Sequence, residues 1–353
     1  MPEPRFLVLR LGSLGDIVHT FPAVAALRDA YPAAEIVWLT HPRWNVLVKS
    51  SGLASELRNI ETRSPSSLRG AIRQVRAGQW DAAIDYQGLW KSAALPFFGG
   101  VKRRIGFSSH TIREWGVPLL YSERVKPETT HIAEQNGELS VRAGAHGVAA
   151  DFALSVSAEN EAAVRLQLQR CGVERYAVIS PGGGWRSKCW PAARFGALCR
   201  EIRESFGLRC VVNYGPGEND LAEAVRAASG DADPLLYDGE LGKLMALLRG
   251  AVCIVGGDTG PLHLAIALGT PAVALFGPTD PTRNGPYHVR PATLRGERCA
   301  GEVLAGHFGD DIVLRAANAT RTHSRNDQTD PSMLAIDVAS VFAAVRRRLG
   351  ITA

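Results

Sequence analysis

Short runs of consecutive apolar residues recur along the chain, and stretches with helical spacing of apolar positions lie between them. In the first half these runs are "RFLVLRL", "EIVWLT" and "DAAIDYQG", and the first leads into the helical pattern "DIVHTFPAVAALRDA". Strands that are apolar without interruption are typical of parallel sheets covered by helices on both faces. The pattern therefore predicts an α/β domain with a parallel sheet in the first half.

The second half repeats this alternation more regularly. The runs "YAVIS", "LRCVVNYG", "PLLYDG" and "AVCIVGGD" each lead through a loop into a helical pattern, and "TPAVALFG" closes the series. Strand, loop and helix repeated in this way predict a second doubly wound domain. We expect an N-terminal domain over residues 1–160, a C-terminal domain over 161–330, and a final helix over 331–353 that packs back on the N-terminal domain.

Ligands of doubly wound sheets bind beyond the carboxyl ends of the strands, so the loops after these runs are the candidate binding loops. Composition adds little to this picture. The chain has 353 residues, of which 46% are hydrophobic, and a formal net charge of +5. A mild positive charge favours an anionic substrate or surface. No run of like charges resembles a nucleic-acid-binding tail, so no nucleic-acid partner is expected.

The cysteines and the apolar runs exclude several other classes. The six cysteines are far apart and include no Cys-x-x-Cys pair, which indicates a reduced, cytoplasmic protein without a zinc site. The apolar run "FLVLRL" contains Arg10 and predicts a strand rather than a signal peptide. The longest apolar window, residues 261–278, is interrupted by Gly269 and Pro271, which argues against a membrane span.

The first glycine loop lies in "LRLGSLGDIVHT", with Gly12, Gly15 and Asp16. A dinucleotide site would need Gly-x-Gly-x-x-Gly and an acid after the next strand, but "EIVWLTH" ends in Thr40 and His41, so NAD binding is disfavoured. Asp16 then has two interpretations. It stabilises a helix start, or it carries out chemistry that requires an ionised carboxylate near the helix dipole.

The second glycine loop is "PGGGWRSKCWP", which contains Gly182, Gly183, Gly184 and Lys188. Three glycines allow backbone N–H groups to approach a ligand closely, and a lysine adds one positive charge, a combination suited to a diphosphate. It is not a P-loop, because Lys188 lacks the flanking glycine and hydroxyl residue. The alternative is a flexible loop with a solvated lysine.

A third loop, "GGDTGPLHLA", ends a strand and begins a helix. Thr259 and Gly260 offer N–H groups at the helix start, which is an anion site. Asp258 could accept hydrogen bonds from sugar hydroxyls. His263 lies one turn later and is either a packed core residue or a neighbour of Asp258 in the site.

Weaker signals come from three further stretches. In "NYGPGEND", Glu218 or Asn219 could bind ribose, or the segment is an ordinary turn. Gln87 and Lys91 in "DYQGLWKSA", together with Arg63, could meet an anionic acceptor or be solvated surface groups. The motif "DAD" at 231–233 reads as a surface turn rather than a metal site, and no metal site or serine-hydrolase elbow is expected.

Five stretches together resemble glycosyltransferase family 9, which contains the lipopolysaccharide core heptosyltransferases. They are "LGSLGDIVHTFPA", "DYQGLWKSA", "SKCWP", "GPGEND" and "GGDTGPLHLAIALGTPAVALFGPTDPTRNGPY". The resemblance implies a GT-B fold, in which two Rossmann-like doubly wound parallel-sheet domains face a cleft. It places the donor in the C-terminal domain and the acceptor in the N-terminal domain. "DYQGLWKSA" is most similar to the members that add the first heptose to the Kdo region of lipid A.

By position, the resemblance implies that Asp16 is the general base and Lys188 the donor-phosphate lysine. The remaining donor contacts it implies are Gly182, Gly183, Gly184, Glu218 or Asn219, Asp258, Thr259, Gly260 and His263. The acceptor contacts expected are Ser13, Arg63, Gln87 and Lys91.

The resemblance further implies an inverting transfer of heptose from ADP-heptose, as donor substrate, to the Kdo region of a lipid A precursor. No cofactor or metal is expected. The partners expected are the nucleotide sugar and an anionic lipid-linked saccharide, bound by a cytoplasmic monomer that contacts the cytoplasmic face of the inner membrane transiently. The alternatives are a family 9 transferase with another sugar or acceptor, a non-catalytic sugar-nucleotide-binding protein, and, least favoured, a dehydrogenase.

Overall fold

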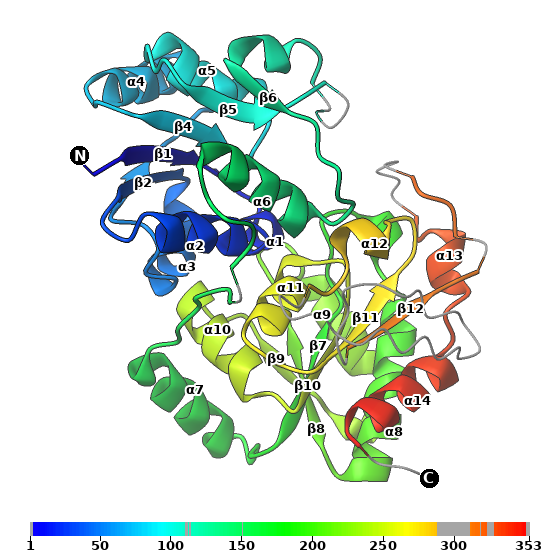
Figure 1. The fold of residues 1–353 in the computed structure, drawn as a ribbon. Coiled ribbons are helices and arrows are strands. Elements are labelled where there is room, and N and C mark those ends of the chain that lie inside the picture. Colours follow the sequence, from blue (N-terminus) through cyan, green and yellow to red (C-terminus); the bar gives the residue numbers. More distant parts are fainter. Residues whose placement is uncertain are drawn as a thin grey trace. The chain divides into compact units, whose positions relative to one another are not determined.

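In a computed structural model the chain divides into two units, Met1–Ser155 and Val156–Ala353, and each contains one parallel sheet of six strands (Figure 1). The structure describes residues 3–109, 112, 114–149, 151–287, 311–317, 319–322 and 328–350. The division precedes helix α7 (Ala158–Arg170), whereas the predicted boundary at 160/161 would cut this helix. Two doubly wound α/β units are as the alternating pattern predicted.

The first sheet has the strand order β3-β2-β1-β4-β5-β6. Its strands are β1 (Arg5–Leu9), β2 (Glu35–Thr40), β3 (Glu56–Asn59), β4 (Ala82–Asp85), β5 (Arg104–Phe107) and β6 (Glu123–Val125). Strands β1, β2 and β4 are the predicted apolar runs. The outer strands β3, β5 and β6 are not evident from the sequence, because "ELRN", "RIGF" and "ERV" are short and partly polar.

Helices cover both faces of the first sheet. They are α1 (Leu14–Val18), α2 (Phe21–Ala30), α3 (Asn45–Ser50), α4 (Pro65–Arg76), α5 (Trp90–Phe98) and α6 (Ile132–Ala143), with short 3-10 turns η1 (Pro42–Trp44) and η2 (Val117–Leu120). One face buries Leu7 and Leu9 of β1 against α4 and α5. On the other, the rings of Phe21 and Trp38 lie 5.8 Å apart.

The single helix predicted over residues 16–30 is wrong in detail, because the structure has two helices there. α1 ends at Val18 and α2 begins at Phe21. Pro22 lies in the first turn of α2, where it needs no intrahelical hydrogen bond. Inside one continuous helix its ring would clash with the carbonyl of Val18 and remove a hydrogen bond, so the helix stops and restarts.

The second sheet has the equivalent order, β12-β11-β10-β7-β8-β9. Its strands are β7 (Tyr176–Ser180), β8 (Arg209–Asn213), β9 (Leu235–Tyr237), β10 (Cys253–Gly257), β11 (Ala272–Phe276) and β12 (Ile312–Arg315). Its helices are α7, α8 (Ala192–Phe206), α9 (Asn219–Ala228), α10 (Leu241–Gly250), α11 (Gly260–Ala267), α12 (Pro281–Asn284), α13 (Pro331–Leu334) and α14 (Val338–Arg348), with 3-10 turns η3 (Arg186–Lys188) and η4 (Gly230–Ala232). The first five strands are those predicted.

The C-terminal helix belongs to the second unit. Val341, Ala344 and Val345 of α14 are buried in the same core as α8 and the strands of the second sheet. The prediction that this helix packs on the N-terminal domain is therefore wrong. The reason is that the apolar face of α14 completes the cover of its own sheet, beside α8.

Trp190 holds this C-terminal segment in place. Its side chain is 1% exposed, and its ring lies 4.9 Å from that of Phe195 in an edge-to-face arrangement. The indole N–H donates to the carbonyl of Ile336, 2.8 Å away, in the link between α13 and α14. One side chain thus joins the segment before α8 to the link that precedes the last helix.

The sequence predicted free cysteines and no membrane span. The five cysteines that the structure describes are free, and Cys299 lies outside the described residues. The window over 261–278 forms α11 and β11. Among the described residues no helix has the length and apolar character needed to cross a bilayer.

Replacing Trp190 tests this packing. Trp190→Ala should lower the free energy of unfolding by about 3–5 kcal/mol, because it leaves a large cavity and removes one of the two hydrogen bonds to the Ile336 carbonyl, the other coming from Arg194. Trp190→Phe, which keeps most of the volume, should cost less. Urea unfolding followed by circular dichroism measures both. Trp115→Ala is the control, since Trp115 is 91% exposed; an equal loss there would contradict the interpretation.

Candidate active site

Each sheet has a point at which the strand order reverses, and the candidate loops lie at these points. In the first sheet β1 pairs with β4, with Leu9 opposite Asp85. In the second, β7 pairs with β10, with Ser180 opposite Gly256. The loops that follow such a strand pair diverge and leave a binding crevice at the carboxyl edge. The glycine loops found in the sequence therefore occupy the expected binding position of each unit.

Three charged or titratable side chains meet at this position in the second unit. Lys188 Nζ lies 2.6 Å from Asp258 Oδ2, and His263 Nε2 lies 2.9 Å from Asp258 Oδ1. All three side chains are at most 10% exposed. The cluster unites two loops that are 70 residues apart in the sequence, and it brings together three of the predicted donor residues.

The backbone places this cluster through one close approach and one helix start. A Cβ atom at Gly256 would lie only 2.9 Å from the carbonyl oxygen of Ser180, so glycine lets β10 lie tightly against β7. Asp258 follows at once, and Thr259 caps α11 by accepting a hydrogen bond from the N–H of Leu262. His263 lies one turn into α11, and its side chain contacts the Asp258 carboxylate. The predicted strand–helix motif is thus a structural unit around one carboxylate.

The pKa of Asp258 reflects two opposing effects. Burial by itself raises the pKa of this carboxyl group. The hydrogen bond with His263 and the attraction of Lys188 and His263 outweigh burial, and hold the pKa of Asp258 well below its usual range. The carboxylate is therefore ionised throughout the neutral range, and it fixes the two side chains around it.

The glycine loop lies beside this cluster and beside Glu218. A Cβ atom at Gly182 would meet the Glu218 carboxylate, so any larger residue there would have to displace the Glu218 side chain. Glu218 also accepts a hydrogen bond of 2.8 Å from the N–H of Gly215. Asn219 is exposed on α9. Of the two residues that the sequence left open, Glu218 is the one next to the glycine loop.

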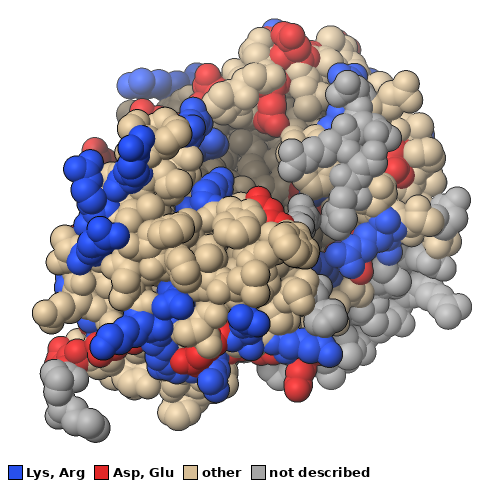
Figure 2. All heavy atoms as spheres, turned by 90° about the horizontal axis from the view of Figure 1, so that it is seen from above, with Lys and Arg blue, Asp and Glu red and all other residues tan. Residues whose placement is uncertain are grey.

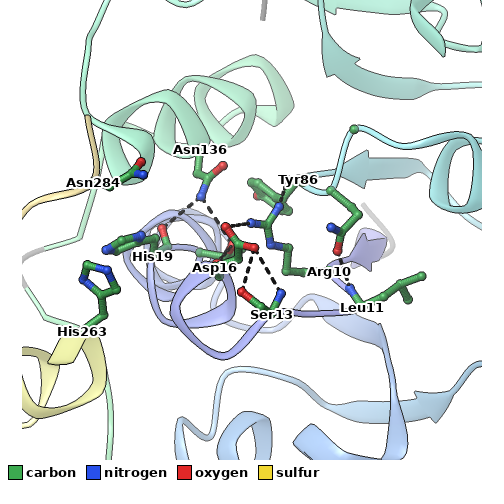
Figure 3. Close-up of polar contacts among 12 residues, drawn as sticks. Arg10, Leu11, Ser13, Asp16, His19, Tyr86, Asn136, His263 and Asn284 are labelled. Carbon is green, nitrogen blue, oxygen red and sulfur yellow. Dashed lines mark hydrogen bonds and ion pairs between the residues drawn. The ribbon is translucent and has the colours of Figure 1, made fainter. Parts of the chain in front are cut away.

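In the first unit, Asp16 lies at the carboxyl edge of β1 and contacts Arg10 and Ser13 (Figure 3). Its Oδ2 accepts hydrogen bonds from the N–H and the hydroxyl of Ser13, at 3.1 and 3.0 Å. Its Oδ1 lies 2.7 Å from Arg10 Nη2. Ser13 and Asp16 form a capping box for α1. The side chain of Asp16 is still 44% exposed, so a ligand can reach it.

Arg10 is itself fixed by the neighbouring strand. Its side chain is 5% exposed and donates through Nη1 to the carbonyl of Tyr86, just beyond β4. Its own carbonyl accepts a hydrogen bond of 3.2 Å from the indole N–H of Trp38. Arg10 thus connects the loop after β4 with the carboxylate of Asp16.

Gln87 is positioned by a buried carboxylate. Asp85 accepts hydrogen bonds from the N–H groups of Gln87 and Gly88 and from the hydroxyls of Ser92 and Tyr121, at 2.8–3.2 Å. Burial raises the pKa of Asp85 despite these hydrogen bonds. Gln87 Oε1 in turn accepts from the N–H of Leu11, 3.0 Å away. The loop after β4 is therefore tied to the Asp16 loop at two places.

The other residues singled out in the sequence lie on the surface. Arg63 is exposed in the link before α4, and Lys91 is exposed in the first turn of α5. Asp233 of the "DAD" motif lies 2.8 Å from Arg209 on the surface, as a turn residue would. Among the described residues no group of three or more histidine, cysteine or acidic side chains has the geometry of a metal site.

Comparison with known proteins identifies the family of this chain. The family model described as glycosyltransferase family 9 (heptosyltransferase) matches residues 68–303, a range that contains the whole Lys188–Asp258–His263 cluster. The lipopolysaccharide heptosyltransferase 1 of Salmonella typhimurium is 30% identical over 80% of this chain and 91% of its own length. The chain belongs to glycosyltransferase family 9. It is therefore a heptosyl-transferring enzyme, and its predicted class is confirmed.

Further relatives support the family and the fold. Lipopolysaccharide heptosyltransferase 3 of Escherichia coli is 28% identical over 75% of this chain and 80% of its own. The structure of E. coli heptosyltransferase WaaC with ADP is 26% identical and has a TM-score of 0.63 over 79% of this chain and 89% of that one. A family 9 structure from Veillonella parvula, at 20% identity, has a TM-score of 0.79 over 100% and 99% and supports the fold alone. The predicted GT-B class is confirmed.

Two residues of this family 9 chain were missed by sequence reasoning. Arg10 was read only as an interruption of an apolar strand, and Trp185 only as a loop residue. The Trp185 ring centroid lies 3.9 Å from the Lys188 ammonium, a cation–π contact. A buried arginine directly after an apolar strand, and a tryptophan in a glycine loop, each need a partner for their polar or aromatic group, and this need was the signal in the sequence.

Asp258 should make the stability of this family 9 enzyme depend on pH. Asp258→Asn leaves the buried Lys188 without a counter-charge and should cost about 3–5 kcal/mol at pH 7. A carboxyl group whose pKa is lower in the folded than in the unfolded protein stabilises the fold fully at pH values above its unfolded pKa, which is near 4. It loses this stabilising contribution as the pH falls towards its pKa in the folded protein. The difference between wild type and variant should therefore be constant from pH 5 to 8 and shrink below about pH 4.

Urea unfolding of both proteins across this pH range measures the effect. Asp231→Asn, at an exposed residue of η4, is the matched control and should leave stability unchanged. A difference that grew on acidification would contradict the assignment of the ion pair.

Proposed function

We propose that the chain transfers heptose from ADP-heptose to the Kdo region of a lipid A precursor, with inversion at the sugar carbon and without a catalytic metal. The observation that carries this proposal is the buried Lys188–Asp258–His263 cluster at the carboxyl edge of the second sheet. Such a cluster beside a glycine loop suits a diphosphate. A family relative of known structure has ADP bound, and relatives of similar length are named heptosyltransferase 1.

The second unit would bind the donor. Lys188, the N–H groups of Gly182–Gly184 and the helix start at Thr259 and Gly260 would bind the diphosphate. Negative charge accumulates there as the sugar–phosphate bond breaks, and preorganised donors stabilise it. Glu218, which lies against Gly182, would accept hydrogen bonds from the ribose hydroxyls.

Asp258 would act mainly by holding Lys188 and His263 in place. Its two oxygens are each engaged, one with Lys188 and one with His263. The sequence alone suggested that Asp258 accepts hydrogen bonds from sugar hydroxyls directly. The geometry favours a different assignment, in which His263 and Lys188 meet the donor and Asp258 orients them.

The first unit would bind the acceptor and supply the base. Asp16 would take the proton from the acceptor hydroxyl as that oxygen attacks the anomeric carbon. Attack from the side opposite the departing diphosphate inverts this carbon. Arg10 and Ser13 keep the Asp16 carboxylate at the end of the loop, so it need not be ordered during the reaction. Gln87, Lys91 and Arg63 would contact the anionic saccharide.

Asp16→Asn tests the base. The amide cannot accept the proton, so kcat should fall by about 10²–10⁴. The affinity for ADP, measured by calorimetry, should not change, because Asp16 is assigned to the acceptor. Asp29→Asn, at an exposed residue of α2, is the control. Transfer at a near wild-type rate in Asp16→Asn would remove Asp16 from this role.

Product analysis tests the substrates. Mass spectrometry of a reaction with ADP-heptose and a heptose-free lipopolysaccharide precursor should show the addition of one heptose. The match to heptosyltransferase 3 favours a second candidate, transfer to an acceptor that already carries heptose. Reaction only with such acceptors would establish that candidate. Binding of ADP without transfer to any acceptor would instead support a non-catalytic protein.

A further inference from the structure

Exposed large apolar side chains are concentrated in one segment of the first unit. Five of them lie within or near α5 and η2, namely Trp90, Phe97, Phe98, Trp115 and Leu119, with exposed fractions from 39 to 91%. We call this set the aromatic patch. Single exposed apolar residues are common on soluble proteins, but several aromatic ones side by side indicate an interaction surface.

Contacts join members of the patch in two groups, one around Trp90 and Trp115 and one at Phe97 and Phe98. The Trp90 indole N–H donates to the carbonyl of Trp115, 3.2 Å away. The Leu119 N–H donates to the carbonyl of Gly116, the residue after Trp115. The rings of Phe97 and Phe98 lie 5.1 Å apart, edge to face. α5 and η2 also share a small core of Ala93, Val117, Leu120 and Tyr121.

Basic side chains border the aromatic patch. Arg104 lies over the Phe97 ring at 5.3 Å and donates to the carbonyl of Leu120. Arg76 donates to the carbonyl of Phe98, 2.7 Å away. Lys91 and Lys102 are exposed nearby in the sequence. Figure 2, which views the molecule from the side where α4, α5 and β6 lie in Figure 1, shows a broad area of uncharged residues with many Lys and Arg and fewer Asp and Glu along its edges.

The charge of this segment is strongly one-sided. Residues 63–104 contain eight lysines and arginines but only two acidic residues, Asp81 and Asp85, which leaves +6. The whole chain carries only +5. The positive charge of the protein is thus concentrated on the segment that carries most of the aromatic patch.

We infer that the aromatic patch and its basic border dock on the surface of an anionic lipid bilayer. Tryptophan suits the boundary between headgroups and acyl chains, because its ring is apolar and its N–H is polar. Lysines and arginines around it attract anionic headgroups. A second copy of the chain is a poorer occupant, since an interface formed by this patch on both copies would bring two basic borders together. The inference deepens the proposed function, whose acceptor is a lipid in such a membrane.

Co-sedimentation of the full-length protein with phospholipid vesicles, free of any saccharide acceptor, tests the docking. The wild type should bind vesicles containing phosphatidylglycerol and bind neutral phosphatidylcholine vesicles at least about tenfold more weakly. Phe98→Ser/Trp115→Ser should weaken binding to anionic vesicles by about tenfold or more. Arg76→Glu/Lys102→Glu, at two exposed residues of the basic border, should do the same, and 0.5 M salt should release the protein.

Leu166→Ser is the matched control, because Leu166 is 49% exposed on α7 and lies outside the patch. It should bind as the wild type does. Transfer to a water-soluble acceptor fragment should be unchanged in Phe98→Ser/Trp115→Ser, which shows that the variant is folded and separates this test from that of the proposed function. Wild-type affinity in that variant, or no binding of wild type to anionic vesicles, would overturn the inference. So would a wild-type dimer that the variant dissociates.

Discussion

Asp258 is a buried carboxylate at the end of a central strand, and an isolated charge in that position would destabilise the fold. It is tolerated because Lys188 and His263 arrive at hydrogen-bonding distance from two different segments. The strand order, the tight contact of β10 with β7 and the cap of α11 all serve to bring these groups together. The second unit is thus organised around one charge that must be matched.

The first unit also contains a buried charge that must be paired, but here the charge is positive. Arg10, buried after β1, is the cation that needs partners, and it finds the Tyr86 carbonyl and the Asp16 carboxylate. In both units the loops that diverge at the reversal of strand order are tied by charged hydrogen bonds. These ties hold the side chains that the proposed reaction requires before any ligand arrives, which reduces the cost of ordering them.

The strands of the core were predictable because burial on both faces leaves an unmistakable apolar run. "AVCIVGGD" and "TPAVALFG" correspond directly to β10 and β11. The outer strands β3 and β6 have few apolar residues, since one edge of each is open to solvent. The helix break at Pro22 was foreseeable from proline chemistry alone, but the helical spacing on either side of it concealed the break.

The sequence by itself determined the two doubly wound units, the positions of the glycine loops and the candidate residues Asp16, Lys188, Asp258 and His263. Only the tertiary structure decided which residues meet: Glu218 rather than Asn219 lies beside Gly182, and Arg10 holds Asp16. It also decided that α14 packs on its own sheet. Local patterns specify elements and loops because these depend on near neighbours. Charge pairing and helix docking join residues that are distant in the chain, so they follow only from the fold.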